Sequence, residues 1–440
     1  MTECLFEQTA AAISAHRIVH PVGRVVSASG GRIAVEGLGD RVKLGDRARI
    51  LSDVSIRSEV IKLIEGRAIV LPEGPVDGVC VGDMVRIDPP APFRPHMNWI
   101  GRVIDPDGNP LDGRALLPGT QKRPLQASPP APNHRRAMGE RLPTGLAVFD
   151  TLLPLAKGQR IGLFAGSGVG KSTLLGNFAK GVQADVIVIA LVGERGREVR
   201  DFVETVLGEE GLARSVVVAA TSDRAPQIRR RCAWAAMSVA EFYRDQGLQV
   251  LLLVDSVTRF AEAHRELAVA GGEPASLRGY PASTGPAIAS LCERAGPGEH
   301  NQGDITAVFS VLVAGSDMDE PVADMLRGVL DGHVVLDREI AERGRFPAVD
   351  LLRSVSRSLP SVATDTENAL ISTARSTLGS YDRSELMIQS GLYVSGTDPK
   401  VDEAIQIYPQ LDAFIGMAQK PNITASFAEL RRALHPTSQR

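Results

Sequence analysis

Short apolar runs separated by glycine turns dominate the first part of the chain. Between residues 19 and 88, a few apolar side chains at a time alternate with polar ones, and glycines punctuate the runs. Regular spacing of this kind predicts a small closed β-barrel. The strands that we expect in it cover residues 23–26, 32–35, 47–50, 59–62, 67–70 and 83–87.

A different pattern holds from residue 158 to residue 360. Near-continuous apolar runs alternate there with segments of helical periodicity. Strands that are apolar on both faces predict a mostly parallel sheet covered by helices, so we expect an α/β core. Its expected strands cover residues 161–164, 186–192, 216–220, 250–254 and 305–313.

The segments around this core have weaker patterns. Residues 89–157 are rich in proline and glycine, and we expect a linker that contains a hairpin at residues 108–113 and leads into the core. Residues 361–440 predict a small α-helical C-terminal domain. Its expected helices cover residues 366–379, 381–390, 399–407 and 427–434, with Gly391, Gly396, Pro409 and Pro421 as breaks.

Residues 1–18 predict a separate amphipathic helix. Its apolar positions fall on one face at helical spacing. Two interpretations are equally weighted: the face binds a partner, or it packs on the protein itself. The residues of this face are Leu5, Phe6, Thr9, Ala12 and Ile13.

Composition narrows the class of protein. The 440 residues are 43% hydrophobic and 23% charged, which excludes a disordered or fibrous chain. A net charge of -3 and a pI near 6.3 lack the basic character of a dedicated nucleic-acid binder, and no nucleic-acid partner is expected. We find no signal peptide and no apolar run of membrane-spanning length. The four cysteines (Cys4, Cys80, Cys232, Cys292) have no CxxC spacing, which favours reduced thiols in a cytoplasmic protein without a structural metal.

A glycine-rich segment between the first core strand and a helical segment carries the strongest chemical signal. Its glycines let consecutive backbone N–H groups converge on phosphate oxygens at a helix N-terminus. The segment therefore predicts a nucleotide-binding P-loop, with Lys171 reaching the β- and γ-phosphates and Ser172 binding Mg²⁺. The alternative, a glycine turn without a ligand, is much less favoured. The predicted nucleotide-binding residues are Ala165, Gly166, Ser167, Gly168, Val169, Gly170, Lys171, Ser172 and Thr173.

Two acidic residues follow other core strands. Asp255 ends the run of residues 250–254, where ligands of an open α/β sheet lie, and we expect it on the Mg²⁺ side of the nucleotide. Its alternative role is to cap the following helix. Glu194 follows residues 186–192 and is the candidate that orients the attacking water, with Arg195 and Arg197 near the γ-phosphate. Taken alone, this charged loop is more typical of a solvated surface.

Arg357 is a candidate for an arginine supplied to a neighbouring subunit. Such a residue accelerates phosphoryl transfer by about 10³- to 10⁵-fold. Without further information, a structural arginine is an equally good interpretation of this position.

Taken together, these stretches resemble the flagellar protein-export ATPases, which are related to type III secretion ATPases and to the catalytic subunit of the rotary ATP synthases. Residues 164–168, Phe-Ala-Gly-Ser-Gly, resemble the flagellar branch in particular. The loop at residues 280–286 departs from the usual family pattern. The stretches that carry the resemblance are residues 158–173, 191–199, 255–261, 317–324 and 330–338.

The resemblance implies a RecA-like P-loop core and a Mg²⁺-dependent ATP hydrolase of the flagellar export apparatus. It implies that Lys171 and Ser172 bind phosphates and Mg²⁺, that Glu194 is the catalytic carboxylate, that Asp255 lies beside the metal, and that Arg357 acts in trans. One chain then supplies both halves of each site, which implies a homohexamer.

The partners that the resemblance implies are a regulator on residues 1–18, the export gate, chaperones and export substrates. The expected location is the cytoplasm, with peripheral attachment to the membrane through the export complex. The alternatives are an injectisome ATPase, a hexameric nucleic-acid translocase and a non-catalytic ring subunit.

Overall fold

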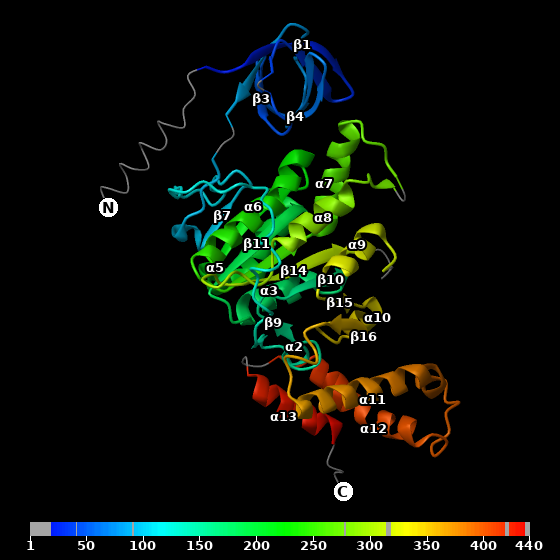
Figure 1. Cartoon of the computed structure of the whole chain (residues 1–440). Helices are drawn as coiled ribbons and strands as arrows, with labels where there is room; N and C mark the ends of the chain where they lie inside the picture. Colours follow the sequence, from blue (N-terminus) through cyan, green and yellow to red (C-terminus); the bar gives the residue numbers. More distant parts are fainter. Residues whose placement is uncertain are drawn as a thin grey trace.

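The structure, a computed structural model, describes residues 19–40, 42–89, 92–276, 279–313, 318–418 and 422–435. Three layers follow one another along the molecule: a barrel at one end, a large sheet covered by helices in the middle, and a helical domain at the other end (Figure 1). This arrangement confirms the predicted fold class. The expected helix of residues 1–18 lies outside the described residues.

The N-terminal barrel closes on itself in the order β1-β2-β5-β4-β3-β6. Buried and exposed side chains alternate along its strands because successive side chains of a strand point to opposite faces. All six runs that the sequence predicted are strands. Their bounds are β1 Val22–Ser29, β2 Arg32–Glu36, β3 Arg47–Leu51, β4 Ser55–Ile64, β5 Arg67–Pro72 and β6 Met84–Asp88.

The central sheet has eight strands in the order β16-β15-β10-β14-β13-β11-β12-β7 within the described residues. All its pairs are parallel except the edge pair of β15 and β16. The five predicted core strands are present, as β10 Arg160–Ala165, β11 Val186–Glu194, β12 Ser215–Thr221, β13 Val250–Asp255 and β14 Ile305–Leu312.

Helices cover both faces of this sheet, so alternate residues of each strand pack into two separate apolar clusters. Helix α3 and the C-terminal helices lie on one face, and α6 to α9 lie on the other. The helices of this region are η1 Met97–Trp99, α2 Ala147–Asp150, α3 Lys171–Gly181, α4 Gly196–Asp201, η2 Phe202–Leu207, α5 Gly208–Ala213, α6 Pro226–Asp245, α7 Val257–Ala270, α8 Thr284–Glu293, α9 Pro321–Val329 and α10 Arg338–Glu342. No described helix is both long and apolar enough to cross a lipid bilayer.

Part of the expected linker belongs to the sheet. Strand β7 (Arg102–Ile104) pairs in parallel with β12 and forms an edge of the sheet. The Arg102 guanidinium of this strand donates two hydrogen bonds, 2.6 and 2.7 Å long, to the Asp112 carboxylate in the segment that follows. A short two-stranded sheet of β8 (Arg141–Leu142) and β9 (Leu155–Ala156) follows. These strands are too short to leave an apolar run in the sequence.

The C-terminal domain contains α11 (Asp365–Gln389), α12 (Pro399–Ile415) and α13 (Ile423–Leu434). The two predicted segments at residues 366–379 and 381–390 form the single helix α11. A capping box of Thr364 and Glu367 stabilises the N-terminus of this helix.

The prediction that Pro409 ends a helix is wrong, because α12 continues through it. The buried side chains of Ile407, Leu411 and Phe414 pack in the main core on both sides of the proline, and this burial offsets the backbone bond that proline removes.

A cluster of buried charges joins the barrel to the core. Arg231 of α6 donates one bond of 2.6 Å to Glu59 of β4 and another of 3.1 Å to Asp107 in the turn after β7. The side chains of Arg231 and Glu59 are each 8% exposed. Because each carboxylate is held away from water, it depends on its arginine partners for stability.

We predict that Arg231→Met lowers the free energy of unfolding by about 3 to 5 kcal/mol, since it leaves buried carboxylates short of a partner. The measurement is the midpoint of urea unfolding. Arg200→Met is the matched control, because Arg200 and Glu204 form an exposed pair on one helix, and we expect a change below about 0.5 kcal/mol there. Equal midpoints for both variants would contradict this account of the junction.

Candidate functional site

The glycine-rich segment forms a tight loop between β10 and α3. Strand β10 ends at Ala165 and α3 begins at Lys171. Gly168 and Gly170 have φ angles of 78° and 85°, which glycine adopts without the strain that other residues incur. The loop therefore aims backbone N–H groups and the N-terminus of α3 into the same space, as an anion site requires.

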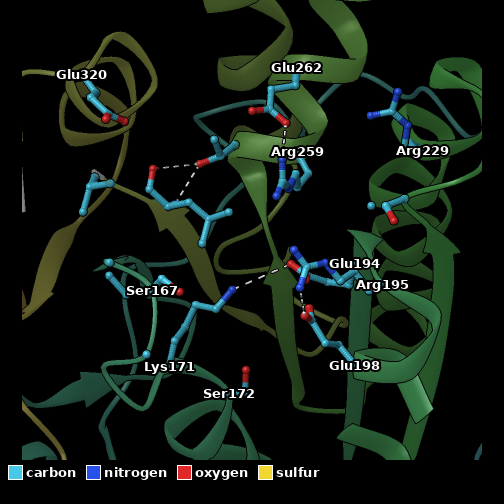
Figure 2. Close-up of a pocket in the computed structure, with 18 of the residues that line it drawn as sticks. Ser167, Lys171, Ser172, Glu194, Arg195, Glu198, Arg229, Arg259, Glu262 and Glu320 are labelled. Carbon is cyan, nitrogen blue, oxygen red and sulfur yellow. Dashed lines mark hydrogen bonds and ion pairs between the residues drawn. The ribbon is translucent and has the colours of Figure 1, made fainter. Parts of the chain in front are cut away.

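A cavity of about 960 Å³ opens above this loop (Figure 2). The loop forms one wall, and the end of β11 with α4, α6 and α7 forms the opposite wall. All but one of the predicted nucleotide-binding residues line the cavity. The exception is Val169, which is buried in the core. The lining residues are Ala165, Gly166, Ser167, Gly168, Gly170, Lys171, Ser172 and Thr173.

The predicted Lys171 and Glu194, which line this cavity, lie close to the predicted Asp255 just outside it. The Lys171 ammonium forms an ion pair with Asp255 and lies 3.9 Å from a carboxylate oxygen of Glu194. Lys171, Glu194 and Asp255 are 12%, 17% and 4% exposed, respectively, so the three charges interact in a largely water-excluded environment. The Ser310 hydroxyl of β14 donates a 2.7 Å bond to Asp255 and fixes its orientation. No motif in the sequence pointed to Ser310.

Burial and the nearby charge of Asp255 raise the pKa of Glu194 to about 7. The Lys171 ammonium works in the opposite direction and is outweighed. A carboxyl group with a pKa near neutrality accepts and releases a proton in the range that acid–base chemistry at neutral pH needs.

Arginine–glutamate pairs surround the mouth of the cavity. Arg195 is largely exposed and lies 3.4 Å from Glu198. The pair of Arg259 and Glu262 on α7 is 2.9 Å apart. The predicted Arg197 does not line the cavity. Arg259 does line it but was not predicted, although it lies within residues 255–261, one of the stretches that carry the family resemblance.

Arg229 of α6, also missed, binds both oxygens of Glu266 at the same mouth. Nothing in the sequence spacing connects it to the P-loop.

Ser172 and Asp255 offer oxygen atoms to a cation. Together with Glu194 they line a smaller cavity of about 120 Å³ below the main one. No group of three or more His, Cys, Asp or Glu in the described residues forms a dedicated metal cage. Two protein oxygens beside a phosphate site fit Mg²⁺, which keeps several waters and binds through one or two protein ligands plus phosphates.

Arg357 lies away from this cavity. It follows β16 (Val349–Ser356), is exposed, and donates a 3.1 Å bond to the carbonyl of Leu330. It lines a different cavity, beside Glu140 and Arg141. The structure of a single chain therefore does not bring Arg357 to the P-loop.

Phe346 lies beside the P-loop, a position that the sequence did not reveal. Its side chain is 52% exposed, and its ring lies 3.2 Å from where a Cβ on Gly170 would be. An exposed aromatic ring beside a phosphate-binding loop provides a flat apolar surface. It sits in the polar loop after α10, with no periodic pattern around it.

The divergent loop at residues 280–286 leads into α8. Ser283 donates a 2.6 Å bond to Glu273 and lies 2.9 Å from the His264 ring. Tyr280 lies under the Arg265 guanidinium, 5.1 Å from ring centre to carbon. Because Arg265 also lines the main cavity, this loop is adjacent to the site.

Comparison with known proteins identifies two matching families. Residues 145–356 match the nucleotide-binding domain of the ATP synthase alpha/beta family, and residues 363–436 match the T3SS EscN ATPase C-terminal domain.

Whole-length relatives cover most of the chain. A flagellum-specific ATP synthase of Caulobacter vibrioides is 45% identical over 402 residues, covering 89% of this chain and 90% of the relative. A type 3 secretion system ATPase of Xanthomonas euvesicatoria is 40% identical over 406 residues, covering 92% and 89%.

Solved structures of a type III secretion ATPase are also similar to this chain. The assembled ATPase EscN of the enteropathogenic E. coli type III secretion system is 36% identical, with a TM-score of 0.87, over 94% of this chain and 100% of EscN. EscN in complex with its central stalk EscO gives a TM-score of 0.84, with the same identity and coverage.

We predict that the pKa of Glu194 makes stability depend on pH. The folded carboxyl binds its proton more tightly than the unfolded one, whose pKa is 4.5. This contribution is full below pH 4.5 and is lost as the pH rises to about 7. The melting temperature, measured with EDTA and without nucleotide, should therefore fall across this range more steeply in the native chain than in Glu194→Gln. The control is Glu204→Gln on the exposed pair with Arg200, and a profile of Glu194→Gln that matches the native one would contradict the prediction.

Proposed function

Because the chain belongs to the family of flagellum-specific ATP synthases and type 3 secretion system ATPases, we propose that it hydrolyses ATP with Mg²⁺ to drive protein export by the flagellar apparatus. The chain is a P-loop ATPase. The observation that carries the proposed mechanism is the meeting of Lys171, Glu194 and Asp255 beside the P-loop. The Phe-Ala-Gly-Ser-Gly segment at residues 164–168, which resembles the flagellar branch, is the feature that favours flagellar over injectisome service.

The P-loop binds the triphosphate in this proposal. Backbone N–H groups of residues 166–171 donate to phosphate oxygens, and Lys171 turns from Asp255 to the β- and γ-phosphates. Ser172 and Asp255 hold Mg²⁺, which neutralises charge on the phosphates when bound. Phe346 provides the surface on which the adenine ring stacks, since its exposed ring lies against the loop at Gly170.

Glu194 acts on water. Its carboxylate accepts a hydrogen bond from the attacking water and orients it toward the γ-phosphorus, in line with the bond to the leaving ADP. Arg195 lies at the mouth of the cavity, where its charge stabilises the γ-phosphate.

Arg357 completes the site of a neighbouring copy. Its side chain is exposed and lies away from the P-loop of its own chain, which is compatible with a reach to the P-loop of a neighbouring copy. A ring of six copies supplies one such arginine to every site. The relative EscN forms an assembly and binds a central stalk, which supports a comparable ring and a stalk-like partner here.

The remaining partners follow from the same role. We propose that residues 1–18 bind a regulatory protein, that export substrates, chaperones and the export gate engage the ring, and that the protein works at the cytoplasmic face of the membrane.

We predict that Glu194→Gln lowers the turnover of ATP by at least about 100-fold, because a general base or water-orienting carboxylate contributes about 10² to 10⁴ in rate. The affinity for Mg·ATP should stay within about threefold, since the residue contacts water and not the nucleotide. Phosphate release and calorimetry measure the two quantities. Glu204→Gln, which alters the exposed pair with Arg200, is the control and should retain most activity. Near-native turnover by Glu194→Gln would remove the residue from the mechanism.

We predict that an Arg357→Ala chain and a Lys171→Ala chain, each inactive alone, recover activity when mixed. Half of the P-loops and half of the arginines are intact at equal amounts, so about one quarter of the native rate is expected in a randomly mixed ring. The measurement is ATP hydrolysis after ring assembly is verified by sedimentation. Mixing Lys171→Ala with Glu194→Gln is the control, because both lesions lie in the same half of the site and no recovery is expected. Assembled rings of the first mixture without activity would show that Arg357 does not act in trans.

A further inference from the structure

Residues 345–347 form a bridge between the P-loop and the C-terminal domain. On one side, the Phe346 ring lies 3.2 Å from where a Cβ of Gly170 would be. On the other side, a Cβ on Gly416, which ends α12, would lie 3.3 Å from the Phe346 carbonyl oxygen and 3.5 Å from the Arg345 Cγ. The loop therefore contacts both the nucleotide site and the last turn of α12.

The Arg345 guanidinium holds this loop in place. Its Nη1 donates a 3.0 Å bond to the Pro347 carbonyl, and its Nη2 donates a 2.9 Å bond to the Val349 carbonyl. Its Nε lies 2.8 Å from an Asp412 carboxylate oxygen on α12. The Arg345 side chain is 11% exposed, so the two carbonyl hydrogen bonds and the ion pair with Asp412 lie in a largely dry environment, which strengthens electrostatic attraction.

The geometry of the guanidinium matters for this role. Its planar fork reaches two carbonyls of the chain after Phe346 and a carboxylate of another domain at once, which a lysine ammonium cannot do with the same rigidity. The two carbonyl bonds fix the backbone on which the Phe346 side chain is mounted. About half of the Phe346 side chain is exposed to solvent, so burial alone does not fix its position.

We propose that Arg345 is a positioning residue that holds Phe346 against the base of the bound nucleotide, and that Asp412 ties this position to α12. The C-terminal helical domain then sets nucleotide affinity through the base and not through the phosphates. This inference rests on the proposed function, in which the nucleotide base stacks on Phe346.

Arg343 provides a matched control. It lies two positions earlier on the same loop and also reaches the C-terminal domain, through a 2.7 Å bond to Glu385 of α11. Its side chain is 47% exposed. Arg343 pairs with Glu385 and Glu339, whereas Arg345 bonds to the carbonyls of Pro347 and Val349, so removal of Arg343 loses a domain contact without releasing Phe346.

The test compares ATP with inorganic tripolyphosphate, each with Mg²⁺, by calorimetry. Tripolyphosphate has the phosphates and no base. We expect Arg345→Met to weaken ATP binding by about 5- to 100-fold, the range for loss of one base–aromatic stack, and to leave tripolyphosphate binding within about twofold. Phe346→Ala should have the same pattern, and the double variant should bind ATP no more weakly than Phe346→Ala alone. Arg343→Met should bind both ligands as the native chain does.

Two further variants keep the test decisive if Arg345→Met folds poorly. Asp412→Asn and Arg345→Lys should raise KM for ATP while kcat stays within about twofold, and the melting temperature reports folding. Equal losses for ATP and tripolyphosphate, additive effects of Arg345→Met and Phe346→Ala, or a kcat loss without a KM change would overturn the inference. Failure of the native chain to bind either ligand would instead overturn the proposed function.

Discussion

The register of parallel strands in the central sheet is the constraint on which the site depends. Strands β11 and β13 pair with Leu191 opposite Asp255, so Glu194 follows at the same edge of the sheet. Strands β10 and β13 both pair with β14, which brings the end of β10 at Ala165 to that edge as well. Because parallel strands end together, residues that are far apart in the sequence converge without any dedicated contact between their loops.

Most of the cationic side chains around the site are already paired with carboxylates, and this explains why the backbone N–H groups of the P-loop are central to binding phosphate. Several arginines at the mouth face a glutamate, as Arg259 faces Glu262 and Arg229 faces Glu266, and Lys171 faces two carboxylates. A triphosphate must compete with these acids for the side-chain cations. The backbone N–H groups of the glycine loop have no such competitor, and they cannot move away. The loop therefore supplies fixed positive charge, and the side chains supply adjustable charge.

Much of the fold and part of the site follow from the sequence. The strands around Leu163, Ile189 and Leu252 are buried on both faces, so their apolar runs are long and specific. Strand β15 (Gly332–Leu336) and strand β16 were missed. The latter alternates buried positions with exposed ones such as Arg353 and is paired on one side only. Short runs of this kind do not differ from loops in composition.

The remaining surprises have a common physical origin in tertiary contacts. Pro409 lies inside a helix because the packing of its neighbours outweighs the local preference. Phe346 faces Gly170, and Arg229 and Ser310 reach the site, only because the chain folds back on itself. Residue identity alone predicted Lys171, Glu194 and Asp255 since their motifs are local to strand ends.

Strand β16 has a consequence for a ring of identical copies. It begins just after the loop that carries Phe346 and ends just before Arg357, and it spans about 26 Å at the usual rise of a strand. Strand β16 pairs with β15 near both of its ends, through Val349 and Asp350 at one end and Val355 and Ser356 at the other, with an irregularity in the register between them. In the ring that we propose, this one strand would join the loop that carries Phe346 in a copy's own site to the Arg357 that serves the neighbouring site. Two adjacent sites would then share a single structural element.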